Sequence, residues 1–387
     1  MENEHIVTAE AVRAGHPDKL CDQIADAILD AHLAQDPNAR VAVEVFATDS
    51  KVLVAGEVTS QAKVNYKKIV WDTLGRLRYK KADLCLDPNG HIDVEVRVHE
   101  QSPDIASAVS GNKELGAGDQ GIMVGYATDE TPEMLPLPVV LAQRICREMD
   151  NMQRDVNWMG VDGKAQVSVV YNGNRPVYVK TIVISVQHSE GVCPACLEQA
   201  IIRGIVMKCV PLSLIHPKTR LLVNPSGSFV LGGPAADTGL TGRKLAVDQY
   251  GPIAHIGGGA LSGKDPTKVD RSGAYMARYI AKNLVVSGLA DRCEVQIAYA
   301  IGRAEPVSVS VDAFGTSAYP NSILARIVRA VFDMRPAAII ERLDMRKPSY
   351  SKIAVYGHYG RLELNLPWER KDKADAIQRE AERLMLN

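Results

Sequence analysis

The sequence contains few aromatic residues and almost no net charge. Its 387 residues include 3 Trp, 4 Phe and 13 Tyr, 5% of the chain, which argues against the aromatic platforms that bind single-stranded nucleic acid. The 45 Lys and Arg residues are balanced by 46 Asp and Glu residues, so the formal net charge is −1. No overall field attracts nucleic acid or an anionic membrane, and any basic site must therefore be local.

Long apolar runs and a disulfide framework are also missing. No segment approaches the ~20 apolar residues that span a bilayer, and residues 1–8 carry charges where a signal peptide has an apolar run. The seven cysteines are an odd number scattered over a long chain, which is typical of reduced thiols. We therefore expect a cytoplasmic protein with neither a membrane nor a nucleic acid as partner.

One cysteine pair has a spacing with chemical meaning. Cys193 and Cys196 form a C-x-x-C motif, the spacing of a redox dithiol or of half a zinc site. No second pair and no paired histidines stand near it, and Cys209 is alone on the far side of an apolar helix. We interpret the pair as small residues at a helix start, with a redox or metal role as the alternative.

Helical and strand periodicities recur in three units, in the order helix, strand, strand, helix, and in the first two units a final strand. Hairpins beside helices predict an α+β fold, with antiparallel or mixed sheets covered by helices on one face. We place the domains at 1–103, 116–234 and 235–387, with termini that can exchange between domains. The predicted helices cover 17–34, 61–78, 137–149, 194–208, 271–286 and 321–332, and the predicted strands cover 41–47, 51–59, 91–99, 166–171, 176–187, 220–223, 293–301 and 307–313.

The segment 257–270 is the richest in candidate chemistry. It holds four glycines, two lysines and two aspartates in fourteen residues, a composition that suits the phosphates of a nucleotide and their divalent cation. Gly258, Gly263 and Lys264 match the P-loop spacing G-x-x-x-x-G-K, but Asp265 stands where a P-loop has Ser or Thr. The segment predicts phosphate binding on a fold other than that of P-loop proteins, with a glycine-rich surface turn as the alternative.

Three further segments share this chemistry. Residues 15–19 open the first helix, whose free N–H groups favour anions; there His16 could stabilise a leaving oxygen, Asp18 could ligate Mg²⁺ and Lys19 could contact phosphate. Segments 116–121 and 232–244 add acids and cations between glycines. Each segment alone also fits a solvated turn, but the four together predict a Mg²⁺–nucleotide site.

Together, in this order along the chain, these motifs resemble those of the S-adenosylmethionine synthetases (methionine adenosyltransferases) over residues 8–368. The resemblance implies three similar α+β domains around a pseudo-threefold axis, in a tight homodimer with active sites between subunits, often paired into a homotetramer. It implies that the thioether of L-methionine attacks C5′ of ATP, with release of tripolyphosphate and its hydrolysis to pyrophosphate and phosphate. It also implies two Mg²⁺ per active site and one K⁺ per subunit.

The resemblance assigns roles to individual residues. The implied catalytic residues are His16, Lys164, Arg243, Lys264 and Lys268. The implied ATP-binding residues are His16, Asp162, Lys164, Phe229, Asp237, Arg243, Lys244, Lys264 and Lys268, with Phe229 stacking on adenine. The implied methionine-binding residues are Glu57, Gln101, Asp119, Asp237 and Lys268. The implied metal ligands are Asp18 and Asp270 for Mg²⁺ and Glu44 for K⁺.

The sequence departs from the family pattern at three positions. Ile256 stands where the family usually has His, Leu261 replaces a customary Phe, and Ser228 stands where many bacterial members have Arg. Two other classes of function remain open from the motifs themselves: a kinase or NTPase of the P-loop kind, and a nucleotide sensor or RNA-binding module that binds phosphate without turnover.

Overall fold

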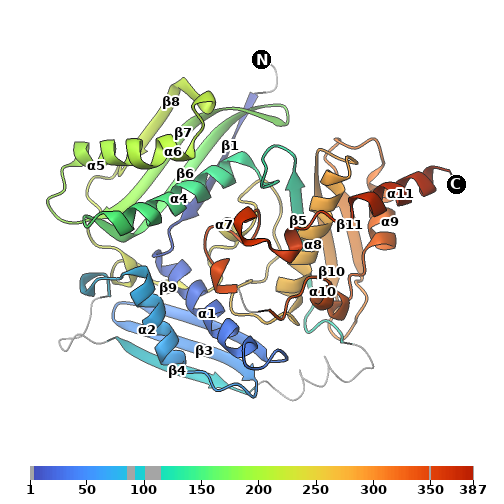
Figure 1. Cartoon of the computed structure of the whole chain (residues 1–387), viewed down its shortest axis with the longest axis horizontal. Helices are drawn as coiled ribbons and strands as arrows, with labels where there is room; N and C mark the ends of the chain where they lie inside the picture. Colours follow the sequence, from blue (N-terminus) through green and yellow to red (C-terminus); the bar gives the residue numbers. More distant parts are fainter. Residues whose placement is uncertain (1–3, 85–91, 101–114, 348–349, 387) are drawn as a thin grey trace.

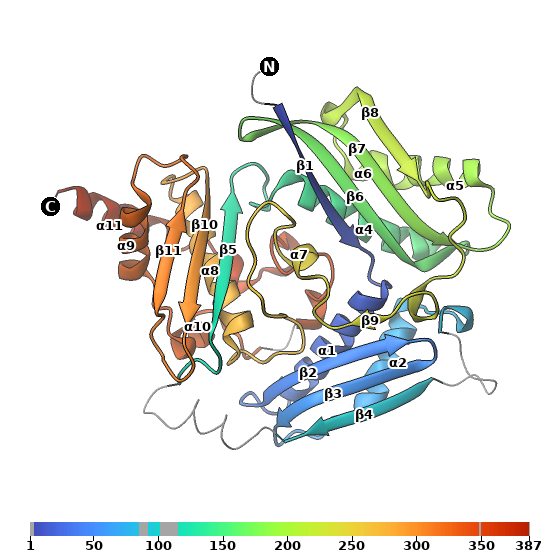
Figure 2. The same cartoon turned by 180° about the vertical axis from the view of Figure 1, so that it is seen from behind.

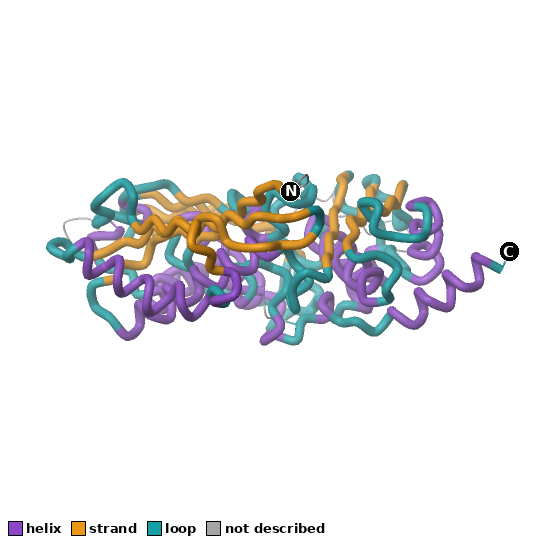
Figure 3. Tube along the Cα trace, turned by 90° about the horizontal axis from the view of Figure 1, so that it is seen from above, coloured by secondary structure: helices purple, strands orange, loops and turns teal. Residues whose placement is uncertain are grey.

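The computed structural model describes residues 4–84, 92–100, 115–347 and 350–386. In this part of the chain three sheets are each covered by helices on one face, and the three layered bodies surround a common centre (Figures 1 and 2). Seen from the side, the strands lie along one side of a flat molecule and most helices along the other (Figure 3). The open faces of the sheets therefore look in one general direction.

The first sheet has the strand order β4-β3-β2-β9 and carries α1 and α2 on one face. Alternate residues of β2, such as Val41, Val43 and Val45, are buried against the helices, whereas Glu44 is exposed on the opposite face, as the period of two dictates. The elements are α1 (Pro17–Leu33), β2 (Arg40–Thr48), β3 (Lys51–Thr59), α2 (Tyr66–Leu77), β4 (Asp93–His99) and β9 (Gly239–Leu240).

The second sheet has the order β1-β6-β7-β8, and α4 and α5 with α6 cover it. A five-residue π-helical segment, Ile202–Val206, joins α5 to α6. The elements are β1 (Glu4–Val12), α4 (Leu137–Asp155), β6 (Met159–Asn172), β7 (Arg175–His188), α5 (Pro194–Ile201), α6 (Met207–Cys209) and β8 (Ile215–Val223).

The third sheet has the order β11-β10-β5, and α8 and α9 pack against it. The short helix α7 and the 3₁₀ turns of the last fifty residues fill the centre of the molecule (Figure 2). The elements are β5 (Gly121–Thr128), α7 (Leu245–Asp248), α8 (Val269–Val286), β10 (Arg292–Tyr299), β11 (Ser308–Asp312), α9 (Asn321–Val331), α10 (Pro336–Arg342) and α11 (Ala374–Met385).

The sheets are not built from consecutive stretches of chain. In each one, the first strand of a predicted hairpin takes an antiparallel neighbour from elsewhere: β2 takes β9, β6 takes β1 and β10 takes β5. The three borrowed strands are absent from the sequence prediction. The α+β class with mixed sheets is confirmed, since β4 pairs in parallel with β3 and β8 pairs in parallel with β7, while the other strand pairs are antiparallel.

Each predicted helix and strand has a counterpart, with shifted ends. Among the helix starts, the largest shift is at α2, which was predicted from residue 61 but begins at Tyr66 because Asn65 caps it, its Oδ1 accepting from the Lys68 N–H at 3.0 Å. Across the described residues, none of the helices is both long enough and apolar enough to cross a membrane.

Candidate functional site

The start of α1 holds a neutral histidine. His16 is the N-cap residue and is 2% exposed, and its Nδ1 accepts from the Asp18 N–H at 3.2 Å. Burial, followed by the charges of Lys244 and Lys164, lowers the pKa of His16 to about 3. Because Nδ1 accepts, the ring proton lies on Nε2, which leaves one N–H donor at a helix end that already favours anions.

Asp18 gathers two cations around this histidine. Its buried carboxylate accepts from the Leu240 N–H at 3.0 Å and from Lys244 Nζ at 2.5 Å, and Arg243 Nη1 lies 3.5 Å away. Burial would raise the pKa of Asp18, but the hydrogen bonds from Lys244 and Leu240 outweigh it and lower the pKa below its usual value. We call His16, Asp18, Arg243 and Lys244 the α1-start cluster.

The strand β6 lies beside this cluster. Lys164 is exposed on β6, and its charge reaches His16. Asp162 is buried, and its carboxylate accepts from the Gly233 N–H at 3.0 Å. Asp162 therefore fixes the start of the glycine-rich loop that leads to Arg243.

Four aspartates at four-residue spacing hold the loops of the C-terminal half on one face of α1. Beyond Asp18, Asp22 accepts from the Gly242 N–H at 2.9 Å, and Asp26 accepts from the Gly263 N–H at 2.8 Å. Asp30 accepts from the N–H groups of residues 350 and 351. The four-residue spacing is visible in the sequence, but only Asp18 was predicted as a site residue; the positioning role of Asp22, Asp26 and Asp30 was missed.

Lys19 does not serve the site in the way suggested from the sequence. Its side chain is 1% exposed, and its ammonium lies between Asp22, at 2.8 Å, and Asp248. Burial would lower the pKa of Lys19, but these two carboxylates raise it overall. Lys19 follows Asp18 by one helical position and points into the protein interior, so the suggested phosphate contact is wrong for this structure.

A second group of predicted residues lines a cleft of about 340 Å³ on the open face of β2 and β3. Glu44, Glu57 and Lys264 line it together with Ala42 and Ala55, which alternate with the buried residues of the two strands. We call this site the β2–β3 cleft. The cleft therefore brings together the residues predicted to bind K⁺ (Glu44), methionine (Glu57) and phosphate (Lys264).

The segment 257–270 connects the cleft to α8. Lys264 pairs with Asp270 in the first turn of α8, and a Cβ on Gly259 would lie 2.1 Å from Asp270 Oδ1. Lys268 Nζ donates to Asp265 at 2.7 Å, and the same buried carboxylate accepts from the Val41 N–H at 2.8 Å. The segment is thus clamped to β2, and the helix begins only at residue 269, as the proline at 266 predicted.

The remaining predicted residues lie outside both groups. Phe229 is half-buried, and its N–H donates to His188 Nε2 at 3.1 Å. Asp119 and Asp237 are exposed, and Gln101 lies outside the described residues. Among the departures from the family pattern, Leu261 is buried in the core, Ile256 is partly buried and Ser228 is exposed.

The two groups are attached to α1 at different heights. Asp18 anchors the loop of the α1-start cluster and Asp26 anchors the segment that reaches the β2–β3 cleft. These eight residues correspond to ~12 Å along the helix. Within the described residues, no hydrogen bond or ion pair joins a side chain of the α1-start cluster to Lys264, Glu44 or Glu57.

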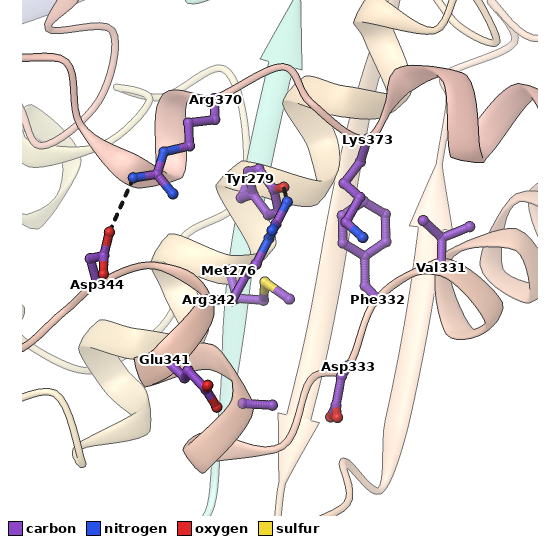
Figure 4. Close-up of a pocket in the computed structure, with 11 residues that line it drawn as sticks. Met276, Tyr279, Val331, Phe332, Asp333, Glu341, Arg342, Asp344, Arg370 and Lys373 are labelled. Carbon is purple, nitrogen blue, oxygen red and sulfur yellow. Dashed lines mark hydrogen bonds and ion pairs between the residues drawn. The ribbon is translucent and has the colours of Figure 1, made fainter.

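A separate pocket of about 480 Å³ lies between α8, α10 and the segment before α11. Met276 and Phe332 lie at its back, and Arg342 and Lys373 extend into it from its sides (Figure 4). None of the predicted site residues lines this pocket. The described residues also contain no group of three or more His, Cys, Asp or Glu side chains able to hold a metal ion.

Comparisons with known proteins agree with this architecture. Models of the S-adenosylmethionine synthetase N-terminal, central and C-terminal domains match residues 4–103, 114–229 and 231–370. An S-adenosylmethionine synthase of Desulforudis audaxviator (strain MP104C) is 50% identical in an alignment that covers 97% of this chain and 98% of the relative.

The N-terminal, central and C-terminal domains follow one another along the chain as they do in this class of three-domain transferases. The chain belongs to the S-adenosylmethionine synthetase family, which confirms the predicted resemblance. It is a methionine adenosyltransferase, an enzyme that makes S-adenosylmethionine from ATP and L-methionine.

Proposed function

We propose that the α1-start cluster binds the triphosphate of ATP and stabilises tripolyphosphate as it leaves C5′, and that the enzyme then hydrolyses tripolyphosphate to pyrophosphate and phosphate. The observation that carries the proposal is the neutral imidazole beside a carboxylate that holds two cations. The thioether has no proton to lose, so its attack needs no general base. The charge of the leaving group is the difficult part, and preorganised cations and N–H donors offset it.

His16 acts at the breaking bond in this proposal. Its Nδ1 is occupied by the Asp18 N–H, so the neutral Nε2–H is the donor for O5′ as charge develops there. Arg243 is about half exposed and offers a planar fork to the phosphoryl oxygens, first during transfer and then during hydrolysis. Lys164, Lys244, Lys264 and Lys268 contact the polyphosphate.

The remaining predicted residues bind the nucleoside of ATP and the methionine. Asp162, Phe229 and Asp237 shape the nucleoside pocket, with the ring of Phe229 stacked on adenine. The methionine ammonium pairs with acids, and the residues proposed to bind methionine are Glu57, Gln101, Asp119, Asp237 and Lys268.

Enzymes of this family need metal ions. We propose that these are Mg²⁺ and K⁺, held by Asp18 and Asp270 and by Glu44 respectively. Asp18 fits because its lowered pKa keeps the carboxylate ionised. Asp270 fits because its carboxylate is only partly buried beside Lys264, and because Gly259 has no side chain that would crowd it. Mg²⁺ would supply charge neutralisation at the phosphate oxygens.

We further propose that the active site is completed by a second copy of the chain, in a dimer or a pair of dimers. The open sheet faces carry apolar side chains that none of the described helices covers, among them Ile6 at 49%, Phe46 at 36% and Ile122 at 56% exposure. An isologous contact of such faces would place the β2–β3 cleft of one copy against the α1-start cluster of the other. The free state of all six described cysteines fits a cytoplasmic enzyme.

Mixing two inactive variants tests the shared site. Lys244→Ala damages the α1-start cluster and Lys264→Ala damages the β2–β3 cleft, so each homodimer should be nearly inactive. When the two variants are dissociated and reassociated, half the dimers contain both chains, and each has one undamaged site. We expect the mixture to regain about a quarter of the wild-type activity; a mixture as inactive as its parents would show that one chain supplies both groups.

Product analysis tests the chemistry separately. ATP and methionine should yield S-adenosylmethionine, pyrophosphate and phosphate, and chelation of Mg²⁺ should abolish the reaction. Formation of ADP and phosphate without methionine would contradict the proposal and favour a kinase or NTPase.

A further inference from the structure

The two cysteines of the C-x-x-C motif are the accessible thiols of the described chain. Cys193 and Cys196 are exposed, whereas Cys21, Cys146 and Cys293 are fully buried and Cys209 is 8% exposed. No thiol has a role in the proposed transfer of the adenosyl group from ATP to methionine. The motif therefore requires an explanation of its own.

The backbone places the two sulfurs on the same turn. Cys193 is the N-cap residue of α5, with φ −64° and ψ 121°, Pro194 is the first helical residue and Cys196 is the third. The Cys193 side chain makes no capping hydrogen bond to the helix, but the N–H groups of Ala195 and Cys196 are close enough to act on its thiol. Residues three apart at a helix start face each other, within the separation that a disulfide bridges.

The same arrangement makes the two thiols unequal. The Cys196 thiol, then the N–H groups of Cys196 and Ala195, lower the pKa of Cys193. The hydrogen bond with Cys193 and its charge raise the pKa of Cys196. Cys193 is thus the more acidic of the two thiols, and it lies at the positive end of the helix.

We propose that Cys193 and Cys196 form a redox-active dithiol that reacts reversibly with low-molecular-weight disulfides such as glutathione disulfide. The Cys193 thiolate attacks one sulfur of the disulfide, forms a mixed disulfide and expels one thiolate. Cys196 then loses its proton to water and attacks the Cys193 sulfur, which closes the Cys193–Cys196 bond and expels the second thiolate. The dithiol gives up two electrons and two protons, and the small disulfide becomes two thiols.

The fold can accept this bond without moving α5. The two sulfurs belong to one turn, while Leu197 and Ile201 of the same helix are buried in the core beneath the second sheet. Helix α5 lies beside the second sheet, at the periphery of the molecule (Figure 1). Oxidation is therefore expected to change the thiols and leave the secondary structure unchanged.

Equilibration of the full-length protein in glutathione buffers, followed by acid quenching, alkylation and peptide mapping, tests the proposal. The wild-type peptide should gain an internal disulfide that dithiothreitol reverses, with Cys21, Cys146 and Cys293 still reduced. Mapping by peptide keeps Cys85, which lies outside the described residues, separate from this signal. Absence of the internal disulfide, or one equivalent of zinc retained by the pair after purification, would overturn the proposal.

Single variants test the order of attack. In Cys196→Ser the second step is blocked, so Cys193 should accumulate as a mixed disulfide with glutathione. In Cys193→Ser the remaining Cys196 should react at least ~10-fold more slowly, because it lacks the N-cap position at which the helix end favours a thiolate. Equal rates in the two variants, or faster reaction of Cys196, would refute the assignment of Cys193 as the attacking thiol. Cys209→Ser is the matched control and should form the internal disulfide at the wild-type rate.

Discussion

The α1-start cluster and the β2–β3 cleft use the same residue types in opposite proportions. With Lys164, the α1-start cluster sets three cations against the single carboxylate of Asp18. The cleft and its border set Glu44, Glu57 and Asp270 against the single cation of Lys264. This difference is consistent with our proposal that the first region binds the polyphosphate and that the second region binds the ammonium of methionine.

The two regions also differ in how complete they are. Asp18 is 1% exposed and receives two cations and an N–H, whereas Asp270 is 21% exposed and pairs with Lys264. Complementary charge on two separately anchored regions is what a shared site requires. The comparison supports our proposal that neither region is a full active site until a second copy covers it.

Breaking the anchor of the cleft should have the largest effect. Asp26→Asn leaves Arg271, which is 0% exposed and lies 2.8 Å from both Asp26 oxygens, without its counterion. Removal of one partner from a buried ion pair destabilises a protein by ~3–5 kcal/mol. Urea unfolding, followed by circular dichroism at one protein concentration, measures this loss.

The matched control for that variant is Asp72→Asn. Asp72 is 62% exposed and pairs with Lys68 on the surface of α2, where such pairs contribute ~0.5 kcal/mol. If Asp26→Asn and Asp72→Asn unfold at the same urea concentration, Asp26 does not anchor the segment 257–270.

A smaller effect, on turnover, is expected at the α1-start cluster. Asp18→Asn keeps an acceptor for the Leu240 N–H but removes the charge that orders Lys244 and Arg243. By analogy with loss of one preorganised transition-state contact, kcat/KM should fall by ~10²–10³-fold. Steady-state assays at saturating Mg²⁺ measure it, and Asp72→Asn again serves as the control. Wild-type kinetics in Asp18→Asn would remove the cluster from the reaction.

The sequence predicted the local elements better than their pairing. The periodicity of Val41, Val43 and Val45 determines which face of β2 is buried, so that strand was predictable. β9 is two residues long, and β1 and β5 precede charged or glycine-rich segments, so none of the three carries a strong strand pattern. Their pairing depends on partners ~150–195 residues away along the chain, which no local pattern encodes.

The site was predictable where chemistry and spacing coincided. His16 and Asp18 lie at the start of α1, and Arg243 and Lys244 lie in a distant glycine-rich segment; the structure brings them together. Lys19 shows the limit of such inference, because the one-residue step along α1 that separates it from Asp18 turns it into the core. A lysine's direction depends on helical phase, which a motif of consecutive letters does not specify.

The smallest effect is expected from a carboxylate-to-amide substitution in the β2–β3 cleft, the more acidic of the two regions. Glu44→Gln removes one carboxylate from the open face of β2, where the side chain is exposed and lines the β2–β3 cleft. Stability should change by no more than ~0.5 kcal/mol, as for most exposed positions. If Glu44 holds K⁺, the stimulation of activity by KCl over choline chloride should weaken while kcat falls by only ~10-fold or less, about 1.4 kcal/mol. Unaltered KCl stimulation in Glu44→Gln would show that the acidic side of the site serves methionine and Mg²⁺ but not K⁺.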